Sequence, residues 1–373
     1  MIKLFKKHIL LVLLFIFIIP IGEAKCKELS SRALFVSVIE NPPVLSSREN
    51  INNLIDFAKQ AHIKILFVQV YHSGQSWFPS KIADDSFYQK YRHVLKEDPL
   101  ALLVKKAHAQ GIQVHVWLNL MSLGGNKNAN FIKKYGTGIL TRNLKEKTNL
   151  EDFKIDKQYF LEPGDPRVGN DLMHMVNEIL STYPDLDGIQ FDYIRYPDHD
   201  PHYGYTNINI ERFKKASGLK AIDDESLIWK DWKRSQVTNL LTKLVKRVHS
   251  RRPHMQVSTT GCMPYPRAYF EAYQEWASWL ESGLLDFVTI MDYSVNIKQF
   301  EGWISVVEEK TKDLSKVKIA VGAYKMINSP QVFEEEYNSC ERMGTTCAVF
   351  YYGSVQESPP IKAFLTRQSS DAK

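Results

Sequence analysis

Several features that mark other protein classes are scarce or missing in this chain of 373 residues. It has only four cysteines, Cys26, Cys262, Cys340 and Cys347, and none of them forms a Cys-x-x-Cys pair. No histidine-rich spacing accompanies them, so we expect no zinc site. Cys340 and Cys347 flank a predicted connection between a helix and a strand, and there the sequence leaves a disulfide and two free thiols equally open.

The sequence also lacks a Gly-x-Gly-x-x-Gly turn after its first predicted strand, and it contains no internal repeat. The missing glycine turn disfavours an open, doubly wound sheet that binds a dinucleotide. The formal net charge is a mild +6, and the positive residues are scattered, so nucleic acid is not an expected partner. We expect no cofactor and no bound metal.

The N-terminus has no apolar run of the ~20 residues that a membrane span needs. A basic start is followed by a short apolar run at residues 9–19, by Pro20, and by Gly22-Glu23-Ala24. This order is typical of a secretory signal peptide over residues 1–24, cleaved after Ala24. We therefore expect a secreted or periplasmic protein without stable membrane insertion. An uncleaved N-terminal anchor is the less favoured alternative.

What the chain does contain is a regular alternation of strand and helix patterns, in a composition that is 44% hydrophobic and 12% aromatic. Eight predicted strands begin near residues 33, 64, 112, 186, 256, 285, 317 and 346. Alternation of this kind implies parallel strands joined by right-handed crossovers. The sequence therefore predicts one domain over residues 25–373, an α/β fold of the (β/α)8 TIM-barrel type. Residues 73–96, 121–164 and 198–225 are predicted to be long loops, which usually carry function.

The chain is organised around residues 186–197, which read Leu-Asp-Gly-Ile-Gln-Phe-Asp-Tyr-Ile-Arg-Tyr-Pro. Ile189 and Phe191 alternate with Gln190 and Asp192, and this period of two predicts a strand. The apolar pair can pack against helices, which turns the polar pair toward the barrel interior. Barrel enzymes keep their chemistry at the carboxyl ends of strands, so Asp192 is the first candidate for a catalytic residue. The plainer alternative is an aspartate that caps a helix or braces a loop.

The predicted strand ends are rich in aromatic and amide side chains, as in a sugar-binding cleft. Glycoside hydrolysis in such a cleft usually needs two carboxyl groups, one protonated and one ionised. Asp292, at the end of the sixth predicted strand, is the second candidate, although strict alternation would turn it partly away from the interior. Glu162 is the third candidate, and its alternative role is to brace the tight Pro-Gly turn beside it. The sequence leaves open whether the reaction retains or inverts the anomeric configuration, with inversion slightly favoured.

Aromatic and amide side chains gather at the other predicted strand ends, a composition typical of a sugar-binding cleft. Each aromatic residue alone belongs more often to a core, so their shared position is the informative feature. The predicted substrate-binding residues are Gln69, Tyr71, His115, Trp117, Asn119, Arg195, Tyr293, Tyr324 and Tyr352.

Five segments of the chain are informative together: Phe67-Val-Gln-Val-Tyr-His-Ser-Gly, Asp98-Pro-Leu-Ala, Ala107-His-Ala-Gln-Gly-Ile-Gln-Val-His-Val-Trp-Leu-Asn, Leu161-Glu-Pro-Gly-Asp-Pro-Arg-Val and Asp187-Gly-Ile-Gln-Phe-Asp-Tyr-Ile-Arg-Tyr-Pro. Through them the chain resembles, from about residue 33 to 352, the glycosyl hydrolase-like family 10 proteins, which are secreted bacterial (β/α)8 barrels. The resemblance implies glycoside hydrolysis, and some members are similar to enzymes that act on peptidoglycan glycan strands.

The chain departs from this family at three places. Tyr71 stands where the family often has Arg, and Tyr193 follows Asp192 where the family often has a second Asp. The sixth strand of the family usually ends Pro-Gln-x-Tyr-Trp, so Asp292 has no carboxylate counterpart there. A distant likeness to family 18 chitinases also exists, but their catalytic acid falls where this chain has Ile194, which excludes that mechanism.

These observations favour a secreted glycoside hydrolase acting on a polysaccharide or oligosaccharide, such as peptidoglycan glycan strands. The alternative from another class is a non-catalytic carbohydrate-binding barrel. A metal-dependent hydrolase or deacetylase using His115, His199, His202 and Asp192 is disfavoured because no predicted strand carries a close His-x-His pair. The sequence leaves the sugar, the linkage and the oligomeric state open.

Overall fold

The structure is a computed structural model that describes residues 32–198 and 200–367. The predicted signal peptide over residues 1–24 and Cys26 lie outside the described residues. Among the helices within them, none combines the length and the apolar character that a membrane span requires.

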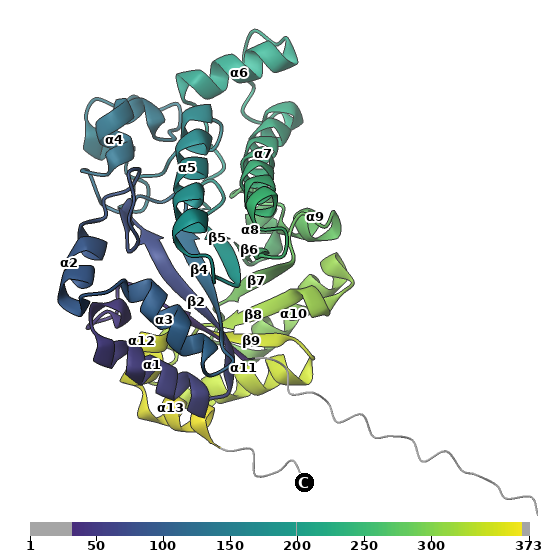
Figure 1. Ribbon diagram of the computed structural model, residues 1–373. Helices are drawn as coiled ribbons and strands as arrows, with labels where there is room; N and C mark the ends of the chain where they lie inside the picture. Colours follow the sequence, from purple (N-terminus) through teal and green to yellow (C-terminus); the bar gives the residue numbers. More distant parts are fainter. Residues whose placement is uncertain (1–31, 199, 368–373) are drawn as a thin grey trace, which may run out of the picture.

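The central element is a closed sheet of parallel strands surrounded by helices (Figure 1). The strand order is β1-β9-β8-β7-β6-β5-β4-β2-β3, and pairing of β1 with β2 closes the sheet. Only the two-residue β3 pairs in the antiparallel sense, as a hairpin on β2. The remaining eight strands form a (β/α)8 TIM barrel, which confirms the predicted fold. The strands are β1 (Arg32–Val36), β2 (Ile63–His72), β3 (Gln75–Ser76), β4 (Gln113–Asn119), β5 (Gly188–Asp192), β6 (Gln256–Gly261), β7 (Phe287–Asp292), β8 (Val317–Val321) and β9 (Thr346–Val349).

Helices connect successive strands of the barrel and cover its outer surface (Figure 1). They are α1 (Arg48–Gln60), α2 (Ser86–Leu95), α3 (Pro99–His108), α4 (Asn130–Tyr135), α5 (Pro166–Thr182), α6 (Asn207–Ser217), α7 (Leu227–Arg251), α8 (Tyr265–Phe270), α9 (Trp276–Glu281), α10 (Ile297–Thr311), α11 (Pro330–Arg342), α12 (Tyr352–Glu357) and α13 (Pro359–Thr366). Short 3-10 turns lie at Val44–Ser46, Gly136–Ile139, Leu150–Phe153, Leu314–Lys316 and Ala323–Lys325.

The three segments predicted to be long loops each contain a helix, namely α2, α4 and α6. The prediction of uninterrupted loops was therefore wrong. Helix α6 illustrates the reason. Its side-chain cap on Thr206 and the left-handed Gly218 after its last residue are ordinary helix boundaries, but Phe213 is its only buried large apolar residue. Short helices with so few apolar contacts give a weak periodic pattern.

The barrel packs in two layers that follow from strand alternation. Ile189 and Phe191 of β5 belong to the large apolar layer between strands and helices, whereas Gln190 points inward and donates to Thr289 Oγ1 of β7 at 2.8 Å. The interior also holds a smaller apolar cluster that includes Phe35, Phe67, Trp117 and Phe287. Alternation along β5 thus points Asp192 to the same side as Gln190, as the sequence pattern predicts.

The glycine of the Asp-Gly-Ile stretch has a steric reason. A Cβ atom on Gly188 would lie 2.2 Å from Nδ1 of His115 on the neighbouring strand β4. The imidazole ring of His115 fills the space beside Gly188, so any side chain at position 188 would have to displace this ring.

A disulfide joins Cys340 of α11 to Cys347 of β9, which settles the alternative that the sequence left open. Only seven positions separate the two cysteines along the chain. Cys262 is the free and buried cysteine of the described residues. The bridge therefore holds the final helix–strand connection of the barrel, next to the strand pair β1–β9.

We predict that replacing both bridged cysteines, Cys340→Ala with Cys347→Ala, lowers the free energy of unfolding by ~2–3 kcal/mol, because the unfolded chain loses a covalent constraint on a short loop. Urea unfolding of the oxidised protein measures the difference. Cys262→Ala controls for the loss of a buried thiol. Equal stability of the wild-type protein with and without a thiol reductant would contradict the prediction.

Candidate active site at the barrel mouth

An open cavity of about 600 Å³ lies at the carboxyl ends of the barrel strands. Each barrel strand, or the turn that follows it, contributes at least one side chain to the lining. Taken in chain order, these include Phe35, Gln69, Trp117, Asp192, Thr260, Met291, Tyr324 and Phe350. The volume falls within the ~300–1,000 Å³ typical of small-molecule sites, and its place is where barrel enzymes carry their chemistry.

Asp192 is the carboxylate that the barrel holds most firmly at this mouth. Its Oδ2 accepts a hydrogen bond from Trp117 Nε1 at 2.9 Å, and its Oδ1 accepts from the backbone N–H of Tyr193 at 2.7 Å and from the hydroxyl of Thr260. These donors come from β4, from the residue that follows β5, and from β6. Asp192 is 4% exposed and lines the cavity. Three donors from three directions fix the orientation of the carboxylate before any ligand arrives.

A second polar group is built around Gln69 on β2. Gln69 Oε1 accepts from Ser37 Oγ at 2.8 Å, and its Nε2 donates to Asn119 Oδ1 at 3.2 Å and lies 3.3 Å from His72 Nδ1. Burial lowers the pKa of His72, while the nearby charge of Asp192 opposes this shift. His72 is therefore mainly uncharged at neutral pH, and the group offers hydrogen bonds without charge.

Another part of the cavity lining carries charged groups of both signs. Arg195 is 5% exposed, its Nη1 lies 2.8 Å from Asp198 Oδ1, and its guanidinium stacks over the ring of Tyr193 at 4.5 Å. Nε of Arg267 lies 3.5 Å from the other carboxylate oxygen of Asp198. Asp198 is thus a second carboxylate of the cavity, held between two guanidinium groups.

Aromatic rings form a continuous wall of the mouth. The ring of Tyr293 stands nearly perpendicular to that of Tyr324, with centroids 5.6 Å apart, and lies 5.0 Å from that of Phe350. Phe350 in turn lies 5.8 Å from Trp117. Tyr324 is 38% exposed, so part of this wall faces solvent and can contact the apolar face of a ligand.

Asp292 does not line the cavity. It lies on β7 between Met291 and Tyr293, which both line the mouth, so alternation turns its carboxyl group toward the helices. The side chain is fully buried, and its Oδ2 has no hydrogen-bond partner among the described residues. It interacts there with Glu336 of α11, and burial raises the pKa of each carboxyl to about 8.

Glu162 also lies outside the cavity lining and is fully buried. Its carboxylate accepts from the hydroxyls of Tyr196 at 2.5 Å and Thr141 at 3.0 Å, and from the backbone N–H of Gly164 at 3.1 Å. Burial raises its pKa. These contacts brace the Pro-Gly turn beside it against the loop that follows β5.

Three of the predicted substrate-binding residues are placed elsewhere. Tyr71 is fully buried in the helix-facing layer, because the register of β2 against β4 shifts between Gln69 and Tyr71 and reverses the face that Tyr71 occupies. His115 lies inside the barrel between Phe67 and Phe287, and burial lowers its pKa to about 3. Tyr352 lines a different cavity, beside α1.

The cavity brings together the other predicted residues, namely Gln69, Trp117, Asn119, Asp192, Arg195, Tyr293 and Tyr324. The cavity is also lined by His72, Asp198, Thr260 and Arg267, which the predicted set of site residues does not include. The placement of His72 depends on the same register shift that turns Tyr71 away. Asp198 and Arg267 lie beyond strand ends, where periodicity gives no direction for a side chain, although the neighbouring Arg195 was a usable signal.

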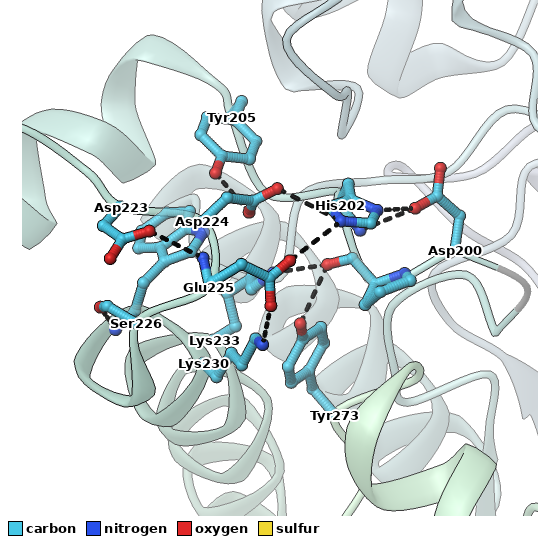
Figure 2. Close-up of polar contacts among 12 residues, drawn as sticks. Asp200, His202, Tyr205, Asp223, Asp224, Glu225, Ser226, Lys230, Lys233 and Tyr273 are labelled. Atoms are coloured by element: carbon cyan, nitrogen blue, oxygen red, sulfur yellow. Dashed lines mark hydrogen bonds and ion pairs between the residues drawn. The ribbon is translucent and has the colours of Figure 1, made fainter.

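The segment that follows Asp198 is anchored to the start of α7 by a polar network (Figure 2). Nδ1 of His202 pairs with Asp200, and its Nε2 lies 3.5 Å from Asp224 Oδ2 and 3.6 Å from Glu225 Oε1. Glu225 also pairs with Lys230 at 2.6 Å. His202 therefore contacts three carboxylates, one from its own segment and two from the residues that precede α7.

Two further groups hold the same segment through its backbone (Figure 2). The carbonyl oxygen of Pro201 accepts hydrogen bonds from Lys233 Nζ at 2.6 Å and from the hydroxyl of Tyr273 at 2.9 Å. Arg195 and Asp198 precede this segment in the chain, so the network lies close in sequence to the part of the cavity wall that carries charge.

No group of three or more histidine, cysteine, aspartate or glutamate side chains suited to a metal ion occurs within residues 32–198 and 200–367. His202 belongs to the anchoring network and His115 to the barrel interior. His199 lies outside the described residues.

Asp292→Asn separates a role in chemistry from a burial cost. Burial raises the pKa of Asp292 from 3.8 to about 8, so the folded protein favours the protonated form and loses stability as the pH rises from about 4 to about 8. We expect the variant to be more stable than the wild type by ~1–3 kcal/mol at pH 8 and to gain less at pH 5. Urea unfolding at both pH values measures this, and a loss of stability at pH 8 would contradict it.

His202→Gln tests the anchoring network. The hydrogen bond to Asp200 raises the pKa of His202 above its ordinary 6.5, helped by Asp224 and Glu225. The protonated imidazole therefore stabilises the segment below that raised pKa, and the stabilisation is lost as the pH rises through it. We expect hydrogen exchange of residues 200–206, corrected for its intrinsic pH dependence, to become faster across this range in the wild type. The same exchange in His202→Gln should show no such transition, and identical profiles would contradict the prediction.

Solved structures with a similar fold include glycosidases. The catalytic domain of a β-amylase from Paenibacillus polymyxa aligns with a TM-score of 0.58 at 11% identity, covering 92% of this chain and 98% of that one. A β-galactosidase from a psychrophilic Marinomonas aligns with a TM-score of 0.58 at 8% identity, covering 82% of this chain and 52% of that one. At these identities the likeness concerns the fold alone.

Relatives of known sequence include two glycosyl hydrolases. The chain is 26% identical over 290 residues to the glycosyl hydrolase DigH of Escherichia coli strain K12, covering 69% of this chain and 63% of that protein. It is 18% identical over 284 residues to the glycosyl hydrolase YngK of Bacillus subtilis strain 168, covering 67% of this chain and 50% of that protein. The aligned part thus spans less than two thirds of the length of these relatives.

The model of the glycosyl hydrolase-like 10 family matches residues 31–339, which include the barrel from β1 to α11 and most of the residues that line its mouth, and the chain therefore belongs to this family.

Proposed function

We propose that the protein is an exported glycoside hydrolase that cleaves O-glycosidic bonds of a bacterial polysaccharide, with the glycan strands of peptidoglycan as the first candidate substrate. The observation that carries this proposal is Asp192, a carboxylate held by Trp117, Thr260 and the Tyr193 backbone within an aromatic-lined cavity. Family membership and the glycosidase-like fold support it.

Asp192 is the catalytic carboxylate of the proposed reaction. Glycoside cleavage passes through a transition state with oxocarbenium character, so positive charge develops at the sugar. A carboxylate fixed beside that charge stabilises the transition state more than the ground state. The donors around Asp192 hold the group in place without occupying the whole cavity.

The second carboxyl group is best sought at Asp198. Of Asp292, Glu162 and Asp198, only Asp198 lines the cavity with Asp192. Arg195 and Arg267 orient it through ion pairs of 2.8 Å and 3.5 Å. Asp292 and Glu162 would need to turn from buried positions outside the cavity in order to reach a sugar there.

The remaining lining groups position the sugar. The amides of Gln69 and Asn119 and the guanidinium of Arg195 can hydrogen-bond hydroxyl groups, while Tyr293 and Tyr324 contact apolar faces of the rings. The predicted signal peptide supports an activity outside the cytoplasm, with a polysaccharide as the proposed partner.

A non-catalytic carbohydrate-binding barrel is the second candidate. One specific observation favours it, because both carboxylates of the cavity already have partners: three hydrogen-bond donors for Asp192, and two guanidinium groups for Asp198. Such a protein would keep the aromatic wall and bind sugar without turnover.

Incubating the mature protein with a panel of polysaccharides, including glycan strands stripped of peptide, tests the proposal by the appearance of new reducing ends. We expect Asp192→Asn to lower turnover at least ~10³-fold, because the reaction loses a charge that the transition state requires. Sugar binding and the melting temperature should change little.

Asp185→Asn is the matched control, because Asp185 is exposed and lies just before the start of β5, at the end opposite to Asp192. Asp198→Asn and Asp292→Asn then identify the partner, since only the true second carboxyl should lower turnover to a similar degree. Binding of a glycan without new reducing ends would establish the carbohydrate-binding alternative, and near-full activity of Asp192→Asn would remove Asp192 from the mechanism.

A further inference from the structure

A second cavity of about 820 Å³ lies beside the mouth, between α1, the turn after β1 and α12. It shares Ile39 and Tyr351 with the lining of the mouth cavity. Ile39 is 64% exposed, and Tyr351 directly precedes α12 as its N-cap residue. The two cavities are therefore neighbours across a single pair of side chains, on the side of the barrel where β1 pairs with β9.

The walls of this second cavity carry several side-chain amides, most of which are free to bind a ligand. Asn41, Asn53 and Gln60 are exposed, and their side chains make no hydrogen bond with any described residue. On the opposite wall, Gln356 is held only through its Oε1, which accepts from Lys362 at 2.8 Å. Amides without partners can both donate to and accept from hydroxyl and acetamido groups.

The base of the cavity is fixed by Glu40. Its Oε1 accepts from the backbone N–H groups of Ser37 at 3.0 Å and Gly353 at 3.2 Å. These bonds join the turn after β1 to the start of α12. A Cβ atom on Gly353 would lie 2.7 Å from the ring of Tyr351 and 3.1 Å from Cγ of Glu40, so any larger residue at this position would push against both side chains.

The charge of the cavity is small for its size. Burial raises the pKa of Glu40 to about 8, so this carboxyl is mainly protonated at neutral pH. Asp56 and Glu357 oppose the single positive charge of Lys362. The cavity therefore offers no strong charge to attract a strongly anionic or strongly cationic ligand. It offers hydrogen-bonding groups that suit a neutral ligand with many hydroxyl groups.

We infer that this second cavity is a distal binding site for uncharged sugar units of the same glycan chain that enters the mouth. The inference rests on the proposed function, and it adds that substrate recognition extends across Ile39 and Tyr351 onto the face formed by α1 and α12. Longer chains should therefore bind more tightly than short ones, because their outer units reach the amides of this cavity.

The test uses the full mature chain with Asp192→Asn, so that binding is measured without turnover. Calorimetry with oligosaccharides of increasing length, prepared from whichever polysaccharide of the panel binds, gives the dissociation constants. We expect affinity to rise with length until the outer units fill the second cavity. Asn53→Trp, which fills part of the cavity from α1, should weaken binding of the longest oligosaccharide about 10-fold, equivalent to ~1.4 kcal/mol, and leave the shortest one unchanged.

Asn338→Trp is the matched control, because Asn338 is also an exposed asparagine in the middle of a helix and lines neither cavity. A second variant, Asn53→Ala with Gln60→Ala, removes hydrogen-bonding groups without adding bulk and should reduce the length dependence in the same direction. Agreement of the two variants supports the inference.

Two results would overturn it in distinguishable ways. Tight binding that does not depend on length, or that Asn53→Trp and Asn338→Trp affect equally, removes the distal site and leaves the proposed function intact. An absence of binding to every oligosaccharide and polysaccharide of the panel removes the proposed function and the distal site together. Occupation of the cavity by a protein partner would appear as the first of these results.

Discussion

The hydrogen bond from the indole of Trp117 to Asp192 depends on the closed parallel register of the barrel. Asn119 of β4 pairs with Asp192 of β5 in that register, and alternation then directs Trp117 and Asp192 toward the same interior. Thr260 reaches the same carboxylate from β6. A carboxylate held by neighbouring strands cannot relax when a ligand approaches, because the sheet itself would have to move. The mouth therefore has a fixed charged centre, around which amides, guanidinium groups and aromatic rings are arranged.

Buried carboxyl groups occur in two kinds of surroundings in this protein. Asp192 has three hydrogen-bond donors within the mouth, whereas Asp292 and Glu336 meet between β7 and α11 with oxygens that no described residue satisfies. The second arrangement makes the charged form costly, which is why burial raises both pKa values to about 8. Such a pair resembles an acid–base site in its titration alone. Its position behind the strand, and not its pKa, separates it from the chemistry of the mouth.

Long connections between strands and helices form the rim of the barrel, and polar contacts hold these connections in place. The segment after β5 carries Arg195 and Asp198, and the network of His202, Lys233 and Tyr273 fastens it to the helices that follow (Figure 2). On the other side, Glu40 joins the turn after β1 to the start of α12. The mouth and the second cavity are thus bounded by two braced connections, and a polymeric ligand that spans both would contact parts of the chain far apart in sequence.

By itself the sequence determined the barrel and the direction of the Asp192 side chain. Strand alternation and the order of strands and helices are local properties that can be read directly along the chain. The same alternation already indicated that Asp292 turns away. Tertiary structure decided what depends on a neighbouring strand or on the path of a loop. The register shift against β4 moved Tyr71 into the helix-facing layer, and the distance between α11 and β9 paired Cys340 with Cys347. The turn beyond β5 brought Asp198 to Arg195 and Arg267. No periodic pattern encodes these contacts, since each depends on how a turn, a helix or a neighbouring strand is placed in space.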